Sequence, residues 1–411
     1  MTKKCYTRKR GQKLSAKGIF SNVRARNFEK FKSYTAPTVD VYKKKLKHRL
    51  CIGSSAQKVM TTWSTLLIQL LINQAVAQMG LLDKYPKEQS GTKNDQLKSQ
   101  YSCKTKGEPQ DWMILYKKKG TTALEFIDGS KKTINAEMNV EDKDNSNPIY
   151  ETFSWYEKKV EGSALFAIYN DALPTARSVS TGGSSKGVFF FEDKSGFFLT
   201  HTVPGFPILQ TEYKWPEDQT NKAHLFICLT LDEKAADTIM SNLPYAGPLI
   251  YAGRTPNWGN GPTEHLKELL NGNSRPPFGD LQHFIAKSPK TGSFVYYMKF
   301  EEPEVDLTSD FISSHLKESF RVFTGMAIKK GDRKLRSTCR VYNVENINNK
   351  VQGLVPYEDG FSWACGNRTF CLLSQGRTMK ERNKHGMAVC TRSAKVYAQF
   401  CPDSIRVNKC P

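Results

Sequence analysis

Two histidine–lysine pairs of this chain have residue types suited to nucleophilic and acid–base chemistry on an anionic substrate. His265-Leu266-Lys267 and His315-Leu316-Lys317 each place a histidine two residues before a lysine. Histidine near its pKa acts as a nucleophile or an acid, and lysine supplies positive charge to an anionic transition state. A strand holds residues i and i+2 on one side, whereas a helix turns them apart. Both pairs lie on segments expected to be helical, so neither is predicted to be catalytic.

A second candidate site is the segment 182–207, which reads GGSSKGVFFFEDKSGFFLTHTVPGFP. Two aromatic runs flank a polar turn and predict a hairpin of two strands. Lys186 precedes the first strand. Ser184 beside it can act as a nucleophile only with a base nearby, and the sequence offers none. His201 is expected to be a packed, structural histidine. The segment is therefore a candidate wall of an active site.

Strands and helices alternate along the rest of the chain. The patterns predict strands at 111–116, 163–169, 188–191, 197–203, 224–231, 293–300, 338–347 and 387–390. They predict helices at 233–243, 263–270, 309–322 and 392–400. Asp232 is expected to cap the first of these helices. Residues 128–149 are polar and 244–262 are rich in glycine and proline, so both are expected to be loops. This mixture favours an α/β or α+β sandwich over an all-β fold.

Most of the net charge of +21 lies in the N-terminal tail. Residues 1–59 contain 17 Lys and Arg against 2 Asp and Glu, whereas the other 352 residues contain 44 against 38. The whole-chain charge would favour a nuclear DNA-binding protein. Because the charge is concentrated in a tail, and because the chain carries features of export, that class is disfavoured. A hydrophobic content of 38% excludes disorder throughout.

The segment 60–77 has the features of a secretory signal peptide. Its apolar stretch has the length of a signal core, and Ala75-Val76-Ala77 supplies a small-x-small cleavage pattern. The stretch is too short for a membrane span, so no stable span is expected. We interpret Met60 as the start of the secreted protein. Residues 1–59 are then a basic, disordered extension, and 78–102 are a flexible lead-in. The alternatives are an amphipathic or buried helix, or an internal signal anchor if translation starts at Met1.

Eight cysteines follow this segment, an even number that indicates disulfides in an oxidising compartment. They are Cys103, Cys228, Cys339, Cys365, Cys371, Cys390, Cys401 and Cys410. No C-x-x-C pair occurs, so zinc-finger spacing is absent and no metal site is predicted. Asn367-Arg368-Thr369 is an N-glycosylation sequon on an expected loop, which predicts a glycan on Asn367 if the protein is secreted.

Several short motifs occur in a fixed order along the chain. They are DWMILYK, FAIYND, SSKGVFFF, HTVPGFP, STCRVYNVENI and YEDGFSWAC, followed by a cysteine-rich end. Together they resemble the deoxyribonuclease II family, over roughly Cys103 to Cys410. The resemblance implies a phospholipase D-like fold, with two pseudo-symmetric halves of mixed β-sheet flanked by helices, here 103–262 and 263–411. In that family each half contributes a His-x-Lys to one active site. One histidine forms a phosphohistidine and the other protonates the leaving oxygen, without a cofactor or metal.

The two motifs that would carry this chemistry are altered here. Where the family has Gly-His-x-Lys-Gly-Val, residues 183–188 read Gly-Ser-Ser-Lys-Gly-Val, so only Lys186 is carried over as a catalytic residue. Where it has Glu-Asp-His-x-Lys-Trp, residues 358–363 read Glu-Asp-Gly-Phe-Ser-Trp. Ser184, Gly360 and Ser362 therefore stand in place of the family's two histidines and second lysine. Trp363 keeps the register and is expected to be structural.

The downstream family pattern Cys-x-Gly-Asp-x-Asn-Arg reads Cys-Leu-Leu-Ser-Gln-Gly-Arg at 371–377, so only the cysteine and the arginine persist. Lys186 and Arg377 are accordingly candidate anion-binding residues. The resemblance also implies disulfides Cys103–Cys228 and Cys371–Cys390. It pairs Cys339 with Cys401 or Cys410, and Cys365 with the other.

Two functions follow from these observations. The first is a secreted or, alternatively, lysosomal protein that does not catalyse and that binds DNA, another polyanion, or a host or extracellular protein. The second is an active metal-independent acid endodeoxyribonuclease that leaves 3′-phosphate products. Loss of a covalent nucleophile costs orders of magnitude in rate, and both histidines are missing, so the first function is favoured. The oligomeric state is not predicted.

Overall fold

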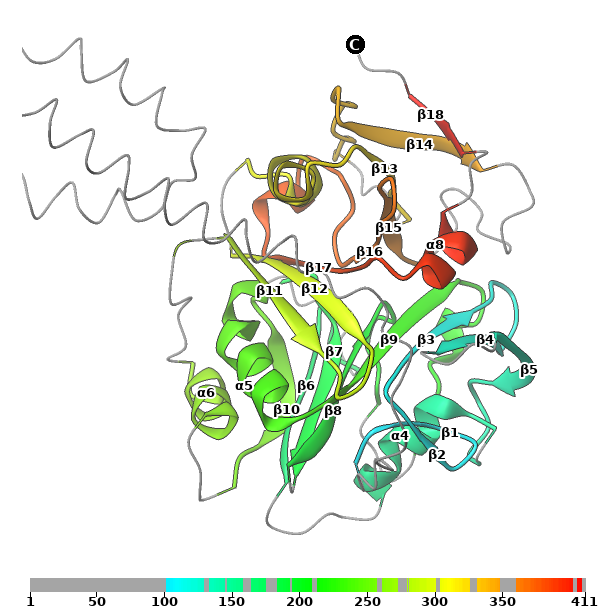
Figure 1. Cartoon of the computed structure of the whole chain (residues 1–411), viewed down its shortest axis with the longest axis vertical. Helices are drawn as coiled ribbons and strands as arrows, with labels where there is room; N and C mark the ends of the chain where they lie inside the picture. Colours follow the sequence, from blue (N-terminus) through cyan, green and yellow to red (C-terminus); the bar gives the residue numbers. More distant parts are fainter. Residues whose placement is uncertain are drawn as a thin grey trace, which may run out of the picture. The chain divides into compact units, whose positions relative to one another are not determined.

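The structure, a computed structural model, describes the chain from residue 101 onward with gaps. The described residues are 101–128, 133–144, 146–157, 164–174, 183–192, 194–208, 213–256, 261–272, 279, 281–300, 304–325, 331–347, 360–401 and 405–408. The expected tail, signal segment and nearly all of the lead-in therefore lie outside the described residues. Two eight-stranded sheets make up most of what is described (Figure 1).

The first sheet is antiparallel throughout, in the order β10-β6-β7-β8-β9-β3-β4-β5. Its strands are β3 (Trp112–Lys117), β4 (Ala123–Asp128), β5 (Thr133–Asn139), β6 (Leu165–Asn170), β7 (Gly187–Glu192), β8 (Ser195–His201), β9 (His224–Leu231) and β10 (Leu249–Arg254). A separate two-stranded sheet consists of β1 (Cys103–Thr105) and β2 (Glu108–Gln110). The hairpin predicted from the aromatic runs is β7–β8.

The second sheet is mixed, because β13 and β14 are parallel and its other neighbours are antiparallel. Its order is β11-β12-β17-β16-β15-β13-β14-β18. The strands are β11 (Leu281–Lys287), β12 (Ser293–Lys299), β13 (Phe320–Phe323), β14 (Val341–Ile347), β15 (Ser362–Cys365), β16 (Phe370–Leu373), β17 (Gly386–Thr391) and β18 (Ile405–Val407).

Short helices connect these strands. They are α4 (Pro148–Glu157), α5 (Glu233–Asn242), α6 (Pro262–Leu270), α7 (Ser313–Leu316) and α8 (Ala394–Phe400), with 3-10 turns η2 (Glu217–Gln219), η3 (Leu243–Ala246) and η5 (Glu381–Asn383) and a π-helical turn η4 (Leu307–Ile312). Asp232 caps α5 as predicted, since its carboxylate accepts a hydrogen bond of 2.8 Å from Ala235 N. None of the described helices is long and apolar enough to cross a membrane.

The two halves repeat one arrangement, which confirms the predicted fold class. In the first sheet the run β7-β8-β9 lies between β6 and β3, and α5 follows β9. In the second sheet the run β15-β16-β17 lies between β13 and β12, and α8 follows β17. Lys186 directly precedes β7 and Ser362 begins β15, so the two altered motifs occupy equivalent ends of equivalent strands.

Three sequence-based assignments were wrong. The expected loop 128–149 contains β5 and the start of α4, and the expected loop 244–262 contains β10. Both strands are sheet edges, where polar residues and glycine are tolerated. The expected helix 309–322 is instead η4, α7 and then β13. Lys317 takes a left-handed conformation, with φ of 56°, and so ends the helical turn before the strand.

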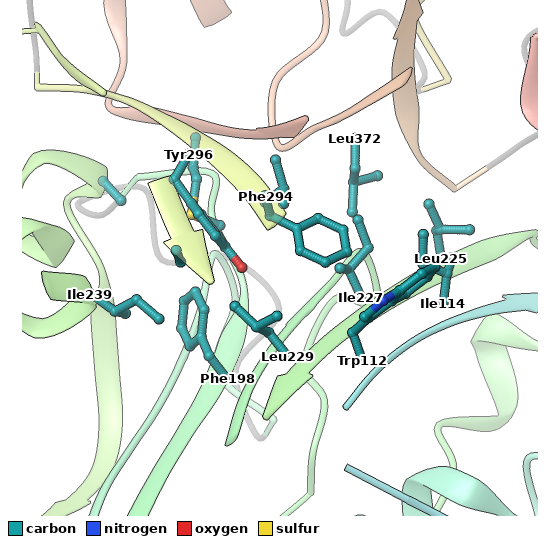
Figure 2. Packing of buried hydrophobic residues seen from close by; sticks show 14 of the residues in the cluster. Trp112, Ile114, Phe198, Leu225, Ile227, Leu229, Ile239, Phe294, Tyr296 and Leu372 are labelled. Carbon is teal, nitrogen blue, oxygen red and sulfur yellow. The ribbon is translucent and has the colours of Figure 1, made fainter. Parts of the chain in front are cut away.

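A shared apolar core lies between the two sheets. Alternate residues of β3 and β9 face this core, including Trp112, Ile114, Leu225 and Ile227, and they meet Phe294 and Tyr296 of β12 and Leu372 of β16 (Figure 2). The intervening residues of β3 and β9, such as Met113 and Phe226, face a second core with α4 on the other side of the first sheet. Both faces of the central strands are therefore buried, which explains their continuous apolar runs.

Disulfides join inner strands of both sheets to neighbouring elements. Cys103 on β1 is bonded to Cys228 on β9, and Cys371 on β16 is bonded to its cross-strand neighbour Cys390 on β17. Cys365 is bonded to Cys401, which selects one of the two alternatives left open by the sequence. Cys339 is also disulfide-bonded. Cys410, its remaining expected partner, lies outside the described residues.

Candidate functional site

The segment before β7 reaches across to the second half of the molecule. Gly183 N donates a hydrogen bond of 2.6 Å to Gly247 O, and Ser184 N donates one of 3.3 Å to His385 O. A Cβ atom at Gly183 would lie 2.0 Å from the Ala246 carbonyl oxygen, so only glycine permits this close approach. The first altered motif is therefore held against residues of both halves by its backbone.

Ser184 is paired with another serine rather than with a base. Its Oγ lies 3.0 Å from Ser374 Oγ, and it also donates to His385 O at 3.3 Å. Ser374 Oγ in turn accepts a hydrogen bond of 2.8 Å from Met387 N. A serine hydroxyl cannot remove the proton of a second serine at neutral pH, so this pair has no activated nucleophile.

Lys186 is buried and its charge is already paired. Its ammonium lies 2.6 Å from Asp171 Oδ2 and donates to Ser184 O at 3.1 Å. The side chain is only 5% exposed. An incoming phosphate would have to displace the Asp171 carboxylate, because a buried ammonium has few free donors.

Two buried histidines lie beside this lysine. Val203 N donates to His201 Nδ1 at 3.2 Å, and His224 Nδ1 lies 3.2 Å from Thr202 Oγ1. Burial, followed by the charge of Lys186, lowers the pKa of His201 to about 3. Burial also lowers the pKa of His224 well below its usual range, with a further contribution from Lys117. Both rings are therefore neutral near pH 7, and neither is suited to act as a general acid there.

The second altered motif contacts the first half through Gly360. Gly360 N donates a hydrogen bond of 3.0 Å to Ala223 O. A Cβ atom at Gly360 would lie 2.6 Å from His224 Cε1, so the imidazole of His224 occupies space into which a larger residue would extend. Phe361 packs edge-on against Tyr116, with 6.3 Å between ring centroids. The backbone at 360–361 thus closes directly onto the first sheet.

Small residues surround Ser362. Ser362 is fully buried, and its Oγ accepts a hydrogen bond of 3.2 Å from Gly325 N. A Cβ atom at Gly376 would lie 2.6 Å from Thr324 Cγ2 and 3.8 Å from Ser362 Oγ. Trp363 is buried and stacks on Phe323 at 5.5 Å between centroids. Ser362 carries no positive charge, unlike the lysine of the family pattern at this position.

Arg377 is held inside the second half. Its Nε lies 2.7 Å from Asp306 Oδ2, and its Nη1 donates to Asn343 Oδ1 at 2.6 Å. Its Nη2 donates to Arg336 O at 3.2 Å, and the residue is 4% exposed. Because all three nitrogens have protein partners, the structure gives Arg377 the role of an internal tie rather than an open anion site.

The two His-x-Lys pairs lie on helical turns, as the sequence predicted. His265 on α6 has its Nε2 3.4 Å from Asp237 Oδ1, at a partly exposed position. His315 on α7 has its Nδ1 2.8 Å from the Tyr297 hydroxyl. Lys317 follows α7 in the left-handed conformation. Among the described residues, no group of three or more His, Cys, Asp or Glu side chains could hold a metal ion.

With this geometry in hand, comparison with known proteins identifies the family. Residues 102–410 match the family described as deoxyribonuclease II. The chain belongs to the deoxyribonuclease II family. It is 25% identical to Plancitoxin-1 of Acanthaster planci over 332 residues, which cover 74% of this chain and 91% of that protein. It is 23% identical to deoxyribonuclease-2-beta of Rattus norvegicus, over 72% of this chain and 88% of the relative. It is 26% identical to cell death-related nuclease 6 of Caenorhabditis elegans, over 73% of this chain and 87% of that protein.

Three residues that contact the altered motifs were not predicted as site residues from the sequence. Ser374 stands where the family pattern has aspartate, so the pattern contained the signal that this position had changed with Ser184. Asp171 follows the FAIYN run of β6, but nothing in the sequence pairs it with Lys186. His224 opens β9 within an apolar run, where a histidine gives no sign of a contact with residue 360.

The Lys186–Asp171 ion pair predicts an asymmetric mutational response. Asp171→Asn leaves a buried ammonium without its carboxylate, which is expected to lower the free energy of unfolding by about 3 kcal/mol. Lys186→Met removes the buried charge and leaves Asp171, whose side chain is 29% exposed, so a change below about 1 kcal/mol is expected. Urea unfolding at pH 7 with intact disulfides measures both. Equal losses in the two variants would contradict this account.

The buried histidines predict acid sensitivity. Their pKa values are lowered in the folded state, so the unfolded chain takes up protons below about pH 6.5 while the folded chain does not. Stability is therefore complete above pH 6.5 and is lost as the pH falls from there toward 3. Each histidine contributes a slope of up to about 1.4 kcal/mol per pH unit. Unfolding of His224→Gln between pH 7.5 and 4.5 is expected to show a shallower slope than the native chain. His265→Gln, whose ring is more than a third exposed, is the control.

Proposed function

We propose that this chain is a secreted member of the deoxyribonuclease II family that does not cleave DNA and acts by binding a partner. The partner is DNA or another polyanion, or a host or extracellular protein. The observation that carries the proposal is the contact between Ser184 and Ser374, where the family pattern has a histidine and an aspartate. A nucleophilic histidine and a carboxylate that could orient it are both replaced, and the two replacements touch.

The closure of the second motif supports the same conclusion. Restoring a histidine at residue 360 would bring its Cβ into the ring of His224 and the carbonyl of Ala223. Restoring an asparagine at residue 376 would bring its Cβ within 2.6 Å of Thr324 Cγ2. Neighbouring side chains have thus taken up the volume of the lost residues. A site that had merely exchanged one acid or base for another would keep that space open.

Burial of the remaining cations argues against phosphate binding at the old centre. Lys186 and Arg377 are both less than a tenth exposed, and each is paired with an aspartate at 2.7 Å or less. Electrostatic stabilisation of a phosphoryl transition state needs donors that are aimed at the reacting atoms and free to bind them. These two donors are directed at Asp171 and Asp306 instead.

Secretion is supported by the disulfides and by the signal-like segment at 60–77. Three disulfides link described residues, and Cys103–Cys228 joins positions 125 residues apart. Such bonds form and persist in oxidising compartments. Export would also expose the protein to the sulfated and phosphorylated polyanions outside cells.

Plasmid cleavage tests the proposal directly. The full chain is expressed in a eukaryotic host, and the protein recovered from the medium is incubated with supercoiled plasmid from pH 4.5 to 7.5, with and without EDTA. No nicking above the level of Lys186→Met is expected, because no described residue supplies an activated nucleophile. A second sample carries Ser184→His, Ser374→Asp, Gly360→His and Ser362→Lys, which restore the two His-x-Lys pairs and the aspartate.

EDTA-resistant cleavage by the native protein that Lys186→Met abolishes would overturn the proposal, since it would show that the retained lysine still serves catalysis. Equal cleavage rates in the native protein and in Lys186→Met would point to a contaminating nuclease. Further purification would then lower both rates together. A gain of cleavage in the fourfold variant would agree with loss of catalysis through these positions.

Glycosylation of the protein in whole-culture lysates, cells and medium together, gives an independent test of secretion. Asn367 is exposed in the turn between β15 and β16, and Thr369 of the sequon is buried with its Oγ1 3.0 Å from Glu318 Oε1. We expect one N-glycan on Asn367, added before the turn between β15 and β16 folds and buries Thr369. Treatment with a peptide N-glycosidase is expected to increase the electrophoretic mobility of the protein, and Asn367→Gln to abolish that change. Asn383→Gln, at an exposed position outside any sequon, is the control. An unchanged mobility in all samples would count against passage through the secretory route.

A further inference from the structure

A short two-stranded ribbon adjoins the altered centre and is formed by residues 332–336 and 376–380. Lys334 and Thr378 form an antiparallel bridge, Leu335 N donates to Arg377 O at 3.0 Å, and Met379 N donates to Arg333 O at 2.8 Å. Lys380 N donates to Asp332 Oδ1 at 3.0 Å, which closes one end. We call this feature the basic ribbon.

Arg377 anchors the basic ribbon from beneath. Its guanidinium joins Asp306 and Asn343 to the carbonyl oxygen of Arg336, and Asn343 Nδ2 donates to Leu335 O at 2.6 Å. Both chains of the ribbon are therefore tied to one buried ionic centre. The backbone that carries its exposed side chains is fixed in advance, which reduces the entropy lost when a ligand binds.

The exposed side chains of the ribbon are cationic. Arg333, Arg336 and Lys380 are all exposed, and Arg340 extends the same segment with another exposed guanidinium. Among the described residues, none of these four is in an ion pair, unlike Arg382 and Lys384 close by. Asp332 is the one carboxylate within residues 331–340. Several exposed cations on one short ribbon form an electrostatic binding surface for polyanions.

One apolar side chain completes this surface. Met379 is 36% exposed and, by the register of the bridge, lies opposite Arg333. It is one of three large apolar side chains of the described residues with that degree of exposure. A flexible thioether next to guanidinium groups suits a ligand that alternates charged groups with apolar ring faces.

We propose that the basic ribbon binds a sulfated glycosaminoglycan chain. The inference rests on the proposed function, because it assumes that the protein acts by binding outside cells, and it names the site and the ligand class. Guanidinium forks match tetrahedral oxyanions in two-point contacts, and three of the four exposed cations are arginines. The old centre supplies no alternative, since its two cations are buried against aspartates.

The side chains of the ribbon favour a sulfated polysaccharide over single-stranded nucleic acid. Single-stranded nucleic acid is bound by cations interleaved with aromatic side chains that stack on bases, and residues 332–336 and 376–380 contain no aromatic residue. A two-stranded ribbon with arginines could also enter the major groove of a duplex, so a DNA duplex is one of the comparison ligands below.

Binding of a size-defined heparin oligosaccharide to the secreted protein tests the proposal. The chemically desulfated oligosaccharide and a 20-base-pair DNA duplex serve as comparison ligands. A variant with Arg333→Ala, Arg336→Ala and Lys380→Ala is expected to bind the sulfated oligosaccharide about tenfold or more weakly, with a smaller dependence on salt. The matched control, Lys234→Ala with Lys267→Ala and Lys287→Ala, removes the same charge from exposed positions elsewhere and is expected to bind within about twofold of native.

Equal weakening in both triple variants would overturn the proposal, since only net charge would then matter. So would equal binding of the desulfated oligosaccharide, or tighter binding of the DNA duplex than of the sulfated ligand. Urea unfolding of each variant shows whether any loss reflects folding. The nuclease assay is separate: cleavage by the native protein would defeat the proposed function while the ribbon result stood. If the native protein does not cleave DNA and the ribbon variant binds the sulfated oligosaccharide as the native protein does, only the ribbon proposal is overturned.

Discussion

A single apolar core shared by the two sheets fixes the position of every residue in the altered centre. Phe198 of β8 packs against Tyr296 of β12, and Tyr116 of β3 packs against Phe361 just before β15. Such aromatic pairs bury large areas and set the distance between the sheets. Because β7 and β15 begin at equivalent places in the two halves, this packing brings the two motifs together whatever residues they carry. The position of the two motifs is therefore set by the core and not by the residue types at 184, 360 and 362.

The two buried cations at the altered motifs are each neutralised by an aspartate. Burying a charge without a partner is costly, so a lysine left behind by a missing histidine must be neutralised or exposed. Asp171 neutralises Lys186 at 2.6 Å, and Asp306 does the same for Arg377 at 2.7 Å. Arg377 also ties the segment that displays the exposed arginines, because its Nη2 donates to Arg336 O.

The local elements with strong patterns followed from the sequence. The aromatic runs around a polar turn specified β7 and β8, and an aspartate before a helical run specified the cap of α5. Prediction failed at the sheet edges, where β5 and β10 carry the polar residues and glycine of loops. It failed again at 309–322, where apolar residues at helical spacing continue into β13. There the choice of a strand is made by pairing with β14 and β15, which the local sequence does not contain.

The sequence by itself determined the family resemblance, the disulfide-rich second half and the absence of histidine at residues 184 and 360. It could not determine what replaced the lost groups, because the partners are distant along the chain. Ser184 and Ser374 are 190 residues apart and yet in hydrogen-bond contact. The aspartate that neutralises Arg377 is 71 residues away from it. Only the packing of one sheet on the other decides which polar groups share a buried site, and charges and volumes must balance there.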